Sequence, residues 1–353
     1  MKSKFIQIGY CAFFFFALLL PQYQSKACSR VVYDDGRGNV ITARSMDWFE
    51  NIPANLWVFP RGIERNGLCG PNSVKWKSKY GSVQTSSYNF TTADGMNEKG
   101  LVANMLWLSD SKYPAFDPNG KQKGIAISIW VSYVLDNFSS VKEVVDAHSN
   151  GEFVIVSTNI PNTSVFASLH LCVSDASGDN AVFEYVNGKL EIHHNKEYRV
   201  MTNEPVFEEQ LAITKYWKNI SGNVMLPGTH NPADRFVRGS YYINALEKVD
   251  NTRVAVASVF GVIRNVSVPL GVTSDKGPNV SATRWRTVAD QKNKVYYFEN
   301  TLTPNAVWVD FKNLNFSENS PIKKLKLDEN EIYAGETSAS FVSSAPLVFL
   351  KAL

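Results

Sequence analysis

The sequence has few residues of the kinds that bind metals or cross-link small domains. Only 4 of its 353 residues are cysteine and 5 are histidine, and no Cys-x-x-Cys pair occurs. This scarcity excludes a disulfide-dense fold and disfavours a thiolate zinc site. The excess of one sign of charge is also small, because the chain has 36 basic and 33 acidic residues. A net charge of +3 is too small to indicate a nucleic-acid partner.

The histidines do not form a pattern that predicts a metal site. His193 and His194 are adjacent at the end of an expected strand, where neighbouring side chains point to opposite faces of the sheet. His148, His170 and His230 are isolated in the sequence. We therefore expect surface or core histidines and no metal.

The first 27 residues predict an export signal. Lys2 and Lys4 precede an apolar run over 5–20, Pro21 ends it, and 25–27 read Ser-Lys-Ala, the small-x-small pattern of a cleavage site. An uncleaved anchor is the alternative, but 16 residues are fewer than the roughly 20 that a spanning helix needs. No later run is apolar enough to span. We expect cleavage after 27, no membrane association afterwards, and one domain over 28–353.

Cleavage there makes Cys28 the first residue. A lipoprotein is a second interpretation of this position, but the third residue before the cysteine is Ser25 rather than an apolar residue, and Lys26 lies between them. Acylation would also block the new amine. Cys69 and Cys172 are the other cysteines after the signal, so at least one thiol of the three stays unpaired within the monomer. Whether Cys69 and Cys172 form a disulfide stays open.

The pattern of apolar residues predicts an α+β domain. Strands are expected at 29–33, 40–45, 56–60, 83–88, 101–108, 153–157, 168–174, 181–186, 189–193, 284–288, 295–299 and 306–311. Helices are expected at 125–135, from a capping box at 140–143, at 234–249 and at 253–265. Strands and helices therefore come in groups rather than in regular alternation.

The first two strands predict a hairpin that returns beside Cys28. With the loop centred between 36 and 37, Tyr33 pairs with Val40 and Cys28 lies opposite Ser45. Asp-Asp-Gly-Arg-Gly-Asn at 34–39 is a strong loop signal.

Two charged residues on the returning strand then lie near Cys28. The guanidinium of Arg44 is expected to lower the pKa of the thiol from about 8.5. The carboxylate of Asp47 is expected to hold the new α-amino group by a charge-assisted hydrogen bond. That amine has an ordinary pKa of about 7.7–8.0, so it can accept the proton of its own thiol. This chemistry needs no histidine.

Five segments in order carry a family resemblance. They are Cys28, ARSMDW at 43–48, DGMNEKGL at 94–101, MTNEP at 201–205 and DRFVR at 234–238. Together they resemble the choloylglycine hydrolase family of N-terminal-nucleophile hydrolases, which includes penicillin V acylases and bile salt hydrolases. The resemblance covers essentially the whole chain after the signal. It implies a four-layer αββα sandwich of two stacked antiparallel sheets.

The resemblance also assigns roles around the thiol. Cys28 matches the nucleophile and its freed amine the base. Arg44 matches the arginine beside the thiol, and Asp47 matches the acid that positions the amine.

Further matches concern the oxyanion that forms during hydrolysis. Asn203 matches its side-chain donor, and the backbone N–H of Trp107 matches the second donor. Arg235 matches a second active-site arginine, with Arg238 as the alternative. The implied reaction forms a thioester from an amide and hydrolyses it with water, without metal or organic cofactor.

The implied substrate is a small N-acyl amide, cleaved in the periplasm by an exported enzyme. The 31 residues between Asn203 and Arg235 are too few for the long assembly loop of Gram-positive relatives. Trp48 and Trp107 are expected to be aromatic walls for a phenoxyacetyl or fatty acyl group, as in acylases of penicillin V or of N-acyl homoserine lactones. The alternatives are a bile salt hydrolase and an inactive exported acyl-binding protein. Relatives often form tetramers, so a homo-oligomer is also implied.

Overall fold

A computed structural model describes residues 28–219, 225–274, 277–278, 281–329 and 331–353. The expected export signal over 1–27 lies outside these residues. No helix in the described parts of the chain has the length and apolar character needed to cross a membrane.

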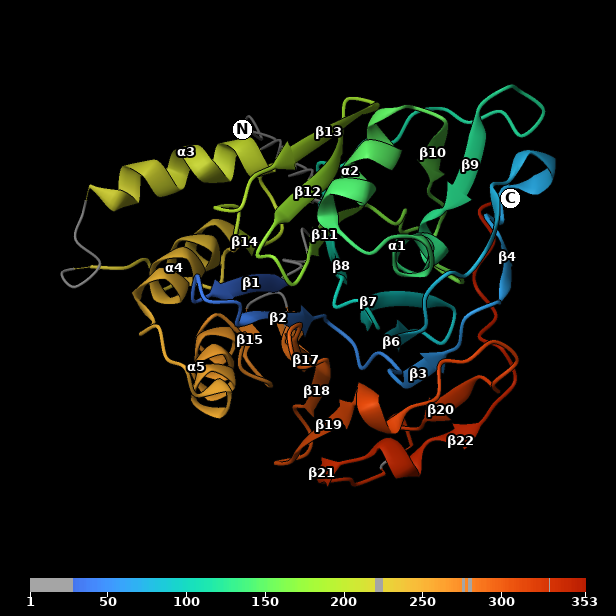
Figure 1. Ribbon diagram of the computed structural model, residues 1–353. Coiled ribbons are helices and arrows are strands. Elements are labelled where there is room, and N and C mark those ends of the chain that lie inside the picture. The colour runs from blue at the N-terminus through green and yellow to red at the C-terminus, as the bar shows by residue number, and fades with distance from the viewer. Residues whose placement is uncertain (1–27, 220–224, 275–276, 279–280, 330) are drawn as a thin grey trace, which may run out of the picture.

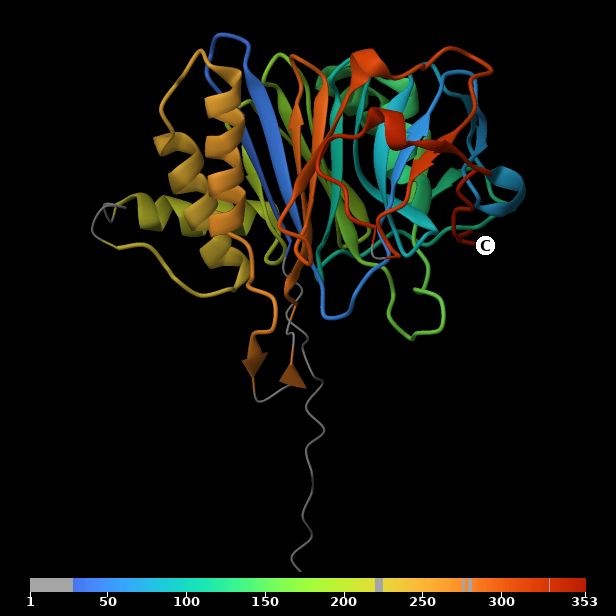
Figure 2. The same ribbon diagram turned by 90° about the horizontal axis from the view of Figure 1, so that it is seen from below.

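Two large β-sheets are stacked in the middle of the molecule, with helices on both outer sides (Figures 1 and 2). Sheet A has seven strands, in the spatial order β14 (Val200–Met201), β1 (Ser29–Asp34), β2 (Val40–Asp47), β17 (Thr283–Asp290), β18 (Val295–Asn300), β19 (Ala306–Asp310) and β21 (Gly335–Glu336). Sheet B has nine strands, in the order β13 (Lys189–His194), β12 (Asn180–Val186), β11 (Leu169–Ser174), β8 (Val102–Trp107), β7 (Thr91–Asn97), β6 (Ser82–Ser87), β3 (Leu56–Phe59), β20 (Lys323–Leu325) and β22 (Val342–Ser343). Every pairing in both sheets is antiparallel except that of β19 with β21.

The helices form the two outer layers (Figure 2). Sheet B is covered by α1 (Trp130–Asn137) and α2 (Val141–Ser149). Sheet A is covered by α4 (Pro232–Ala245) and α5 (Thr252–Asn265), and α3 (Phe207–Lys218) packs on α4. Smaller elements are the strand pairs β4 (Glu64–Asn66) with β5 (Lys75–Lys77), β9 (Lys123–Ala126) with β10 (Phe153–Val156) and β15 (Thr273–Ser274) with β16 (Gly277–Pro278), and the short turns Gly70–Asn72, Ile127–Ile129, Phe311–Asn313 and Ser338–Ser340.

The central strands are buried on both faces, because each sheet lies between its partner and a helical layer. All eight residues of β2 and all six of β8 are buried. Strands in that position have near-continuous apolar or internally bonded side chains rather than an alternating pattern. The α+β sandwich expected from the sequence is therefore confirmed.

Most expected elements are present, but one begins differently from the prediction and two others were not predicted. The segment 125–135 was expected to be helical throughout, but its start belongs to β9, which pairs in parallel with β10, and α1 begins only at Trp130. The β7 strand and the α3 helix were not predicted. The N-terminus of α2 was predicted well, because the Ser140 side chain accepts a hydrogen bond from the Glu143 N–H.

The first hairpin has a register that differs by one residue from the expected one. Asp34 pairs with Val40, so the loop is centred on Arg37. The cause is the Asp35 carboxylate, which accepts hydrogen bonds from the backbone N–H groups of Arg37 at 2.7 Å and Asn39 at 3.0 Å. Continuing this register places Cys28 level with the residue after Ser45.

The three described cysteines are all buried free thiols. Cys69 and Cys172 therefore do not form the disulfide that the sequence left open. Cys172 lies on β11 in sheet B, whereas Cys69 precedes the short turn at Gly70–Asn72.

Candidate active site

Cys28 immediately precedes β1 and is only 2% exposed. Its Sγ lies 3.8 Å from the Sδ of Met46 and 3.8 Å from the carbonyl oxygen of Asp47. Its backbone nitrogen donates to Oδ1 of Asn203 at 2.5 Å. In the full chain this nitrogen is the amide that joins Cys28 to the expected export signal, and cleavage at that bond would leave a primary amine at the same place.

Asn203 is held by three hydrogen bonds that fix the orientation of its side-chain amide. Oδ1 accepts from the nitrogen of Cys28 and from Nη2 of Arg235, the latter at 2.9 Å. Nδ2 donates to the carbonyl oxygen of Trp107 at 2.7 Å. Both partners of Oδ1 are donors and the partner of Nδ2 is an acceptor, so only one orientation of the amide satisfies all three. One hydrogen of Nδ2 remains beyond the bond to Trp107.

Arg235 is the second arginine of the site. Its Nη1 donates to the carbonyl oxygen of Cys28 at 2.6 Å and to Oγ of Ser29 at 2.5 Å, and lies 4.0 Å from Oδ2 of Asp47. Arg238 points elsewhere, donating to the carbonyl oxygens of residues 227 and 229. Both arginines lie on α4 as near neighbours on one side of the helix, but their side chains reach different partners. The structure therefore places Arg235 at Cys28.

Arg44 lies beside the thiol, as expected. Its Nη2 lies 3.9 Å from Sγ of Cys28 and donates to the carbonyl oxygen of Met105 at 3.0 Å, and the guanidinium stacks on Trp285 at 4.5 Å from the ring centre. Burial nevertheless raises the pKa of the Cys28 thiol above its ordinary value, and the attraction of Arg44 only partly opposes it. The expected net lowering is therefore wrong for this chain, because desolvation of the thiolate outweighs one guanidinium.

Asp47 is fully buried at the end of β2. Its carboxylate accepts from Oγ1 of Thr283 at 2.5 Å and from Oγ of Ser45 at 3.3 Å. Burial raises the pKa of this carboxyl to about 6, although Arg235 and the hydrogen bond from Thr283 act in the opposite direction. The hydrogen bond of the Cys28 nitrogen goes to Asn203 and not to Asp47.

The backbone of Trp107 faces Asn203. The N–H of Leu108 donates to the carbonyl oxygen of Ser168 on the β11 side. In an antiparallel ladder the neighbouring residue then directs both its N–H and its C=O to the other side. The bond from Asn203 to the Trp107 carbonyl agrees with this direction. The Trp107 N–H therefore lies on the same side of β8 as the amide of Asn203.

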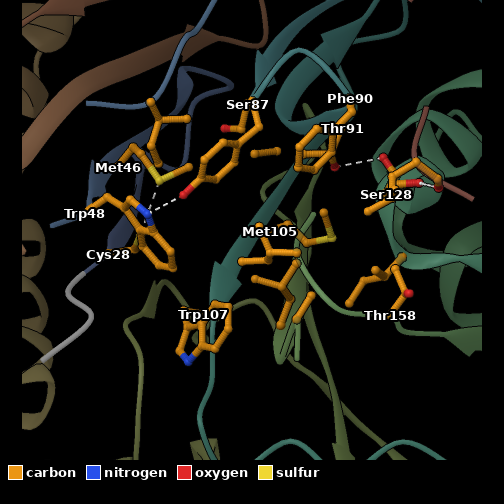
Figure 3. Close-up of a pocket in the computed structure, with 18 of the residues that line it drawn as sticks. Cys28, Met46, Trp48, Ser87, Phe90, Thr91, Met105, Trp107, Ser128 and Thr158 are labelled. Atoms are coloured by element: carbon orange, nitrogen blue, oxygen red, sulfur yellow. Dashed lines mark hydrogen bonds between the residues drawn. The ribbon is translucent and has the colours of Figure 1, made fainter. Parts of the chain in front are cut away.

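An apolar pocket opens beside the thiol. Its empty volume is about 710 Å³, including the solvent-filled space at its mouth. Figure 3 shows Cys28, Trp48 and Trp107 at one end, and Ser128 and Thr158 at the other. The two tryptophan rings lie 5.5 Å apart, centre to centre. We call this the acyl pocket, lined by Cys28, Arg44, Met46, Trp48, Ile52, Ser87, Tyr88, Phe90, Thr91, Ala93, Met105, Trp107, Ile127, Ser128, Thr158, Ile160, Ala167, Leu169 and Leu350.

Two hydroxyls at the far end of the acyl pocket already donate to backbone carbonyls. Oγ1 of Thr91 donates to the carbonyl of Ser128 at 2.9 Å, and Oγ of Ser128 donates to that of Leu350 at 2.6 Å. Their polar hydrogens are used within the protein, so this end presents mainly apolar surface to a ligand.

Sequence reasoning missed residues that hold the predicted ones in place. Tyr88 accepts a hydrogen bond from Nε1 of Trp48 at 2.6 Å and donates to Glu50, which fixes one aromatic wall. Met46 contacts both Arg44 and Cys28, since its Sδ is 3.5 Å from Nη2 of the arginine and 3.8 Å from Sγ of the cysteine. Only Met46 carried a signal, its place between Arg44 and Asp47.

A buried carboxylate between the sheets was also missed. Asp94, on β7, lies 3.9 Å from Nη1 of Arg44 and accepts from Asn104 at 2.6 Å, from Thr287 at 3.1 Å and from Tyr296. It partly balances the charge of Arg44. Among the described residues no cluster of three or more metal-ligating side chains occurs.

Comparisons with known proteins agree with this geometry. Residues 28–326 match the model of the family described as linear amide C–N hydrolases, choloylglycine hydrolase family. The chain is 43% identical to a penicillin V acylase of Pectobacterium atrosepticum over 99% of this chain and 98% of that protein. It is 30% identical to a bile salt hydrolase/transferase of Clostridium perfringens over 82% and 95% of the two chains.

Solved structures give the same picture. A penicillin V acylase from Agrobacterium tumefaciens superimposes with a TM-score of 0.85 at 52% identity, covering 92% of this chain and 99% of that one. A conjugated bile acid hydrolase from Clostridium perfringens superimposes with a TM-score of 0.73 at 25% identity, covering 86% and 97%.

Proposed function

Because the chain belongs to the choloylglycine hydrolase family of linear amide C–N hydrolases, we propose that it cleaves penicillin V and similar small N-acyl amides. The observation that carries the proposal is the apolar pocket, walled by Trp48 and Trp107, that begins at the sulfur of Cys28. A flat aromatic acyl group bound there would present its carbonyl carbon to that sulfur.

The proposed reaction has two steps. After removal of residues 1–27, the amine of Cys28 takes the proton of its own thiol, and the thiolate attacks the substrate carbonyl. The C–N bond then breaks, the leaving nitrogen takes the proton back from the ammonium, and a thioester remains. In the second step water attacks the thioester, the amine takes a proton from that water, and the thiol and a carboxylic acid are released. In the uncleaved chain burial raises the pKa of the thiol, so the group is a thiol that needs a base before it can attack.

Asn203 and Trp107 are proposed to stabilise the oxyanion. The remaining hydrogen of Asn203 Nδ2 and the Trp107 N–H lie on the same side of β8. Donors of this kind typically account for about 10²–10³ in turnover each. Asn203 has a second task, because its Oδ1 accepts from the nitrogen that becomes the catalytic amine.

The charged residues are proposed to orient and balance these groups. Arg44 favours the thiolate when it forms, and Arg235 fixes the Cys28 carbonyl and Asn203. The Asp47 carboxylate acts on the same residue, because its negative charge raises the pKa of the Cys28 thiol. A new ammonium there would lower the pKa of Asp47 from its value of about 6 in the uncleaved chain.

The acyl pocket favours an apolar acyl group over a hydroxylated steroid. Most of its lining is aliphatic or aromatic, and two of the hydroxyls at its far end, those of Thr91 and Ser128, already donate to backbone carbonyls. We therefore rank phenoxyacetyl amides first and N-acyl homoserine lactones second. Conjugated bile acids come third, as the substrates named for the more distant relatives.

The export signal leads us to propose that the enzyme works outside the cytoplasm, in the periplasm. A homo-oligomer, such as the tetramer implied by the family resemblance, stays a prediction. Intact-mass measurement and N-terminal sequencing of the exported protein test the maturation, and we expect an unmodified Cys28 as the first residue.

A rate panel tests the substrate class. Penicillin V, acyl homoserine lactones and taurine- or glycine-conjugated bile acids are compared at equal concentration, with release of phenoxyacetate as the readout for the first. We expect the highest kcat/KM for penicillin V. Fastest turnover of the bile acids would overturn the ranking, and hydrolysis that is unchanged in Cys28→Ala would overturn the mechanism. An inactive binding protein would bind the acyl group without release of product.

A further inference from the structure

We propose that His170 and Glu184 are positioning residues that hold Asn203 at the reacting atoms. The inference rests on the proposed function, because it concerns the residue assigned to the oxyanion and the amine. His170 is one of the histidines that carried no role in the sequence, and it does not touch Cys28 or the acyl pocket.

His170 makes two short hydrogen bonds in the interior. It lies on β11 and is 1% exposed. Its Nε2 is 2.8 Å from the carbonyl oxygen of Thr202, the residue directly before Asn203. Its Nδ1 is 2.8 Å from Oε1 of Glu184 on the neighbouring strand β12. A carbonyl oxygen only accepts, so Nε2 carries the hydrogen of the bond to Thr202.

Glu184 bonds the far end of the segment 202–207, which begins at Thr202. Its Oε2 accepts from the backbone N–H of Phe207, the first residue of α3, at 2.9 Å. The imidazole of His193 lies 3.8 Å from the same oxygen. The His170–Glu184 pair therefore bonds both ends of the segment 202–207, which contains Asn203.

Gln210 on α3 bonds three further groups of this segment. Its Nε2 donates to the carbonyl oxygens of Asn203 at 2.6 Å and Pro205 at 2.9 Å, and its Oε1 accepts from Oγ1 of Thr202 at 2.8 Å. Beyond Met201 the strand β14 has ended, so no sheet ladder fixes the backbone here. Side-chain hydrogen bonds set the place of Asn203.

The arrangement matters because Asn203 must reach both sheets at once. It contacts the nitrogen of Cys28 beside sheet A and the carbonyl of Trp107 in sheet B. His170 and Glu184 belong to sheet B, whereas Thr202 follows a strand of sheet A, so their bonds tie the two sheets together at this point. A displacement of about 1 Å in a catalytic group can cost about 10²-fold in rate.

The test compares two substitutions of His170 with a matched control. His170→Phe keeps the ring and removes both hydrogen bonds, whereas His170→Gln keeps a donor that reaches the Thr202 carbonyl. His148 is the control, because it is also buried and both its ring nitrogens are hydrogen-bonded away from the site: Nδ1 to the carbonyl oxygen of Val144, and Nε2 as acceptor from Nε1 of Trp130. Each variant is assayed on whichever N-acyl amide the natural enzyme cleaves fastest.

We expect His170→Phe to lower kcat by about 10- to 100-fold with KM changed by less than about threefold, since the acyl pocket is untouched. His170→Gln should recover kcat to within about threefold of the natural enzyme, and His148→Phe should lower the melting temperature while leaving kcat within about twofold. Equal losses of kcat in the His170→Phe and His148→Phe variants, or a loss confined to KM, would overturn the proposal.

A readout without substrate separates this proposal from the proposed function. Hydrogen exchange of the Phe207 amide should become at least about tenfold faster in His170→Phe, and unchanged in His148→Phe. This holds even if the substrate ranking is wrong. Unchanged exchange at 202–207 in His170→Phe would contradict the positioning role whatever the enzyme cleaves. If the His170→Phe chain fails to fold, His170→Gln decides between the two outcomes, because an ordinary core role would predict no rescue by a donor.

Discussion

The two sides of the Cys28 sulfur differ in polarity and in hydrogen bonding. On one side lies a cluster of buried polar groups that bond to one another and to the surrounding backbone and hydroxyls, and we call it the Cys28 cluster: Cys28, Arg44, Asp47, Asn203 and Arg235. On the other side the acyl pocket is apolar and aromatic. The difference teaches that rate and selectivity are separable here. Changes in the cluster should act on kcat, and changes in the pocket should act on KM and on substrate preference.

The sharpest test of the cluster is Asn203→Ala. It removes an oxyanion donor and the acceptor that holds the Cys28 nitrogen, so we expect kcat to fall by at least about 10²–10³-fold. KM should change little, because no pocket atom is lost. Steady-state kinetics on penicillin V measure both quantities. A rise in KM with unchanged kcat would break the proposed division between cluster and pocket.

Asp47 should add a second decline to the acid side of the pH–rate profile, below the one that protonation of the Cys28 amine produces. Its carboxyl pKa of about 6 in the uncleaved chain is an upper limit for the cleaved enzyme, because a neighbouring ammonium favours the ionised form. Protonation as the pH falls removes the charge that faces the ammonium. We expect this second decline of kcat to have its midpoint at or below pH 6. Asp47→Asn should be slower throughout and lack this decline; a second decline that persists in Asp47→Asn would assign it to another group.

Trp48→Ala should act in the opposite way from the cluster variants. Loss of one aromatic wall removes contact area from the acyl group, so KM for penicillin V should rise by about tenfold while kcat changes by less than about threefold. The control is Trp308→Ala on β19, a partly exposed tryptophan outside the acyl pocket, which should change neither constant. A fall in kcat alone for Trp48→Ala would place this residue with the cluster.

The smallest expected effect belongs to Tyr88→Phe. The change removes the hydroxyl that accepts from Trp48 Nε1 but keeps the ring that lines the pocket. We expect KM to rise by about two- to fivefold, in line with the loss of one hydrogen bond. Quenching of tryptophan fluorescence by a bound phenoxyacetyl compound gives an independent affinity. An unchanged affinity would show that packing against neighbouring rings alone holds Trp48.

Much of the site was predictable from residues that lie close together in the sequence. The hairpin that follows Cys28 was evident from its β-branched runs and its Asp- and Gly-rich loop, and it brings Arg44 and Asp47 to the thiol. The register was predicted one residue off, because the side chain of Asp35 bonds the loop backbone and sets its shape. Loop side-chain bonds of this kind are not visible in hydrophobic patterning.

Other parts of the site depend on contacts between distant segments. His170 and Glu184 lie in strands that look like ordinary core, whereas Asp94 begins a family segment that gave it no role. The partners of all three are on other elements. The direction of the thiol pKa was missed for the same reason, since the extent of burial around Cys28 depends on both sheets and on α4.

By itself, the amino-acid sequence predicted that a cysteine follows a cleavage signal. It also determined that the domain mixes grouped strands and helices, and which family motifs accompany that cysteine. Only the folded molecule decided that Arg235 rather than Arg238 bonds the carbonyl oxygen of Cys28. It also decided that Cys69 and Cys172 stay apart, and that Asn203 bridges the two sheets. The physical reason is range. Side-chain periodicity and turn chemistry act over a few residues, whereas desolvation and hydrogen bonding across the sandwich depend on groups that the chain brings together from far apart.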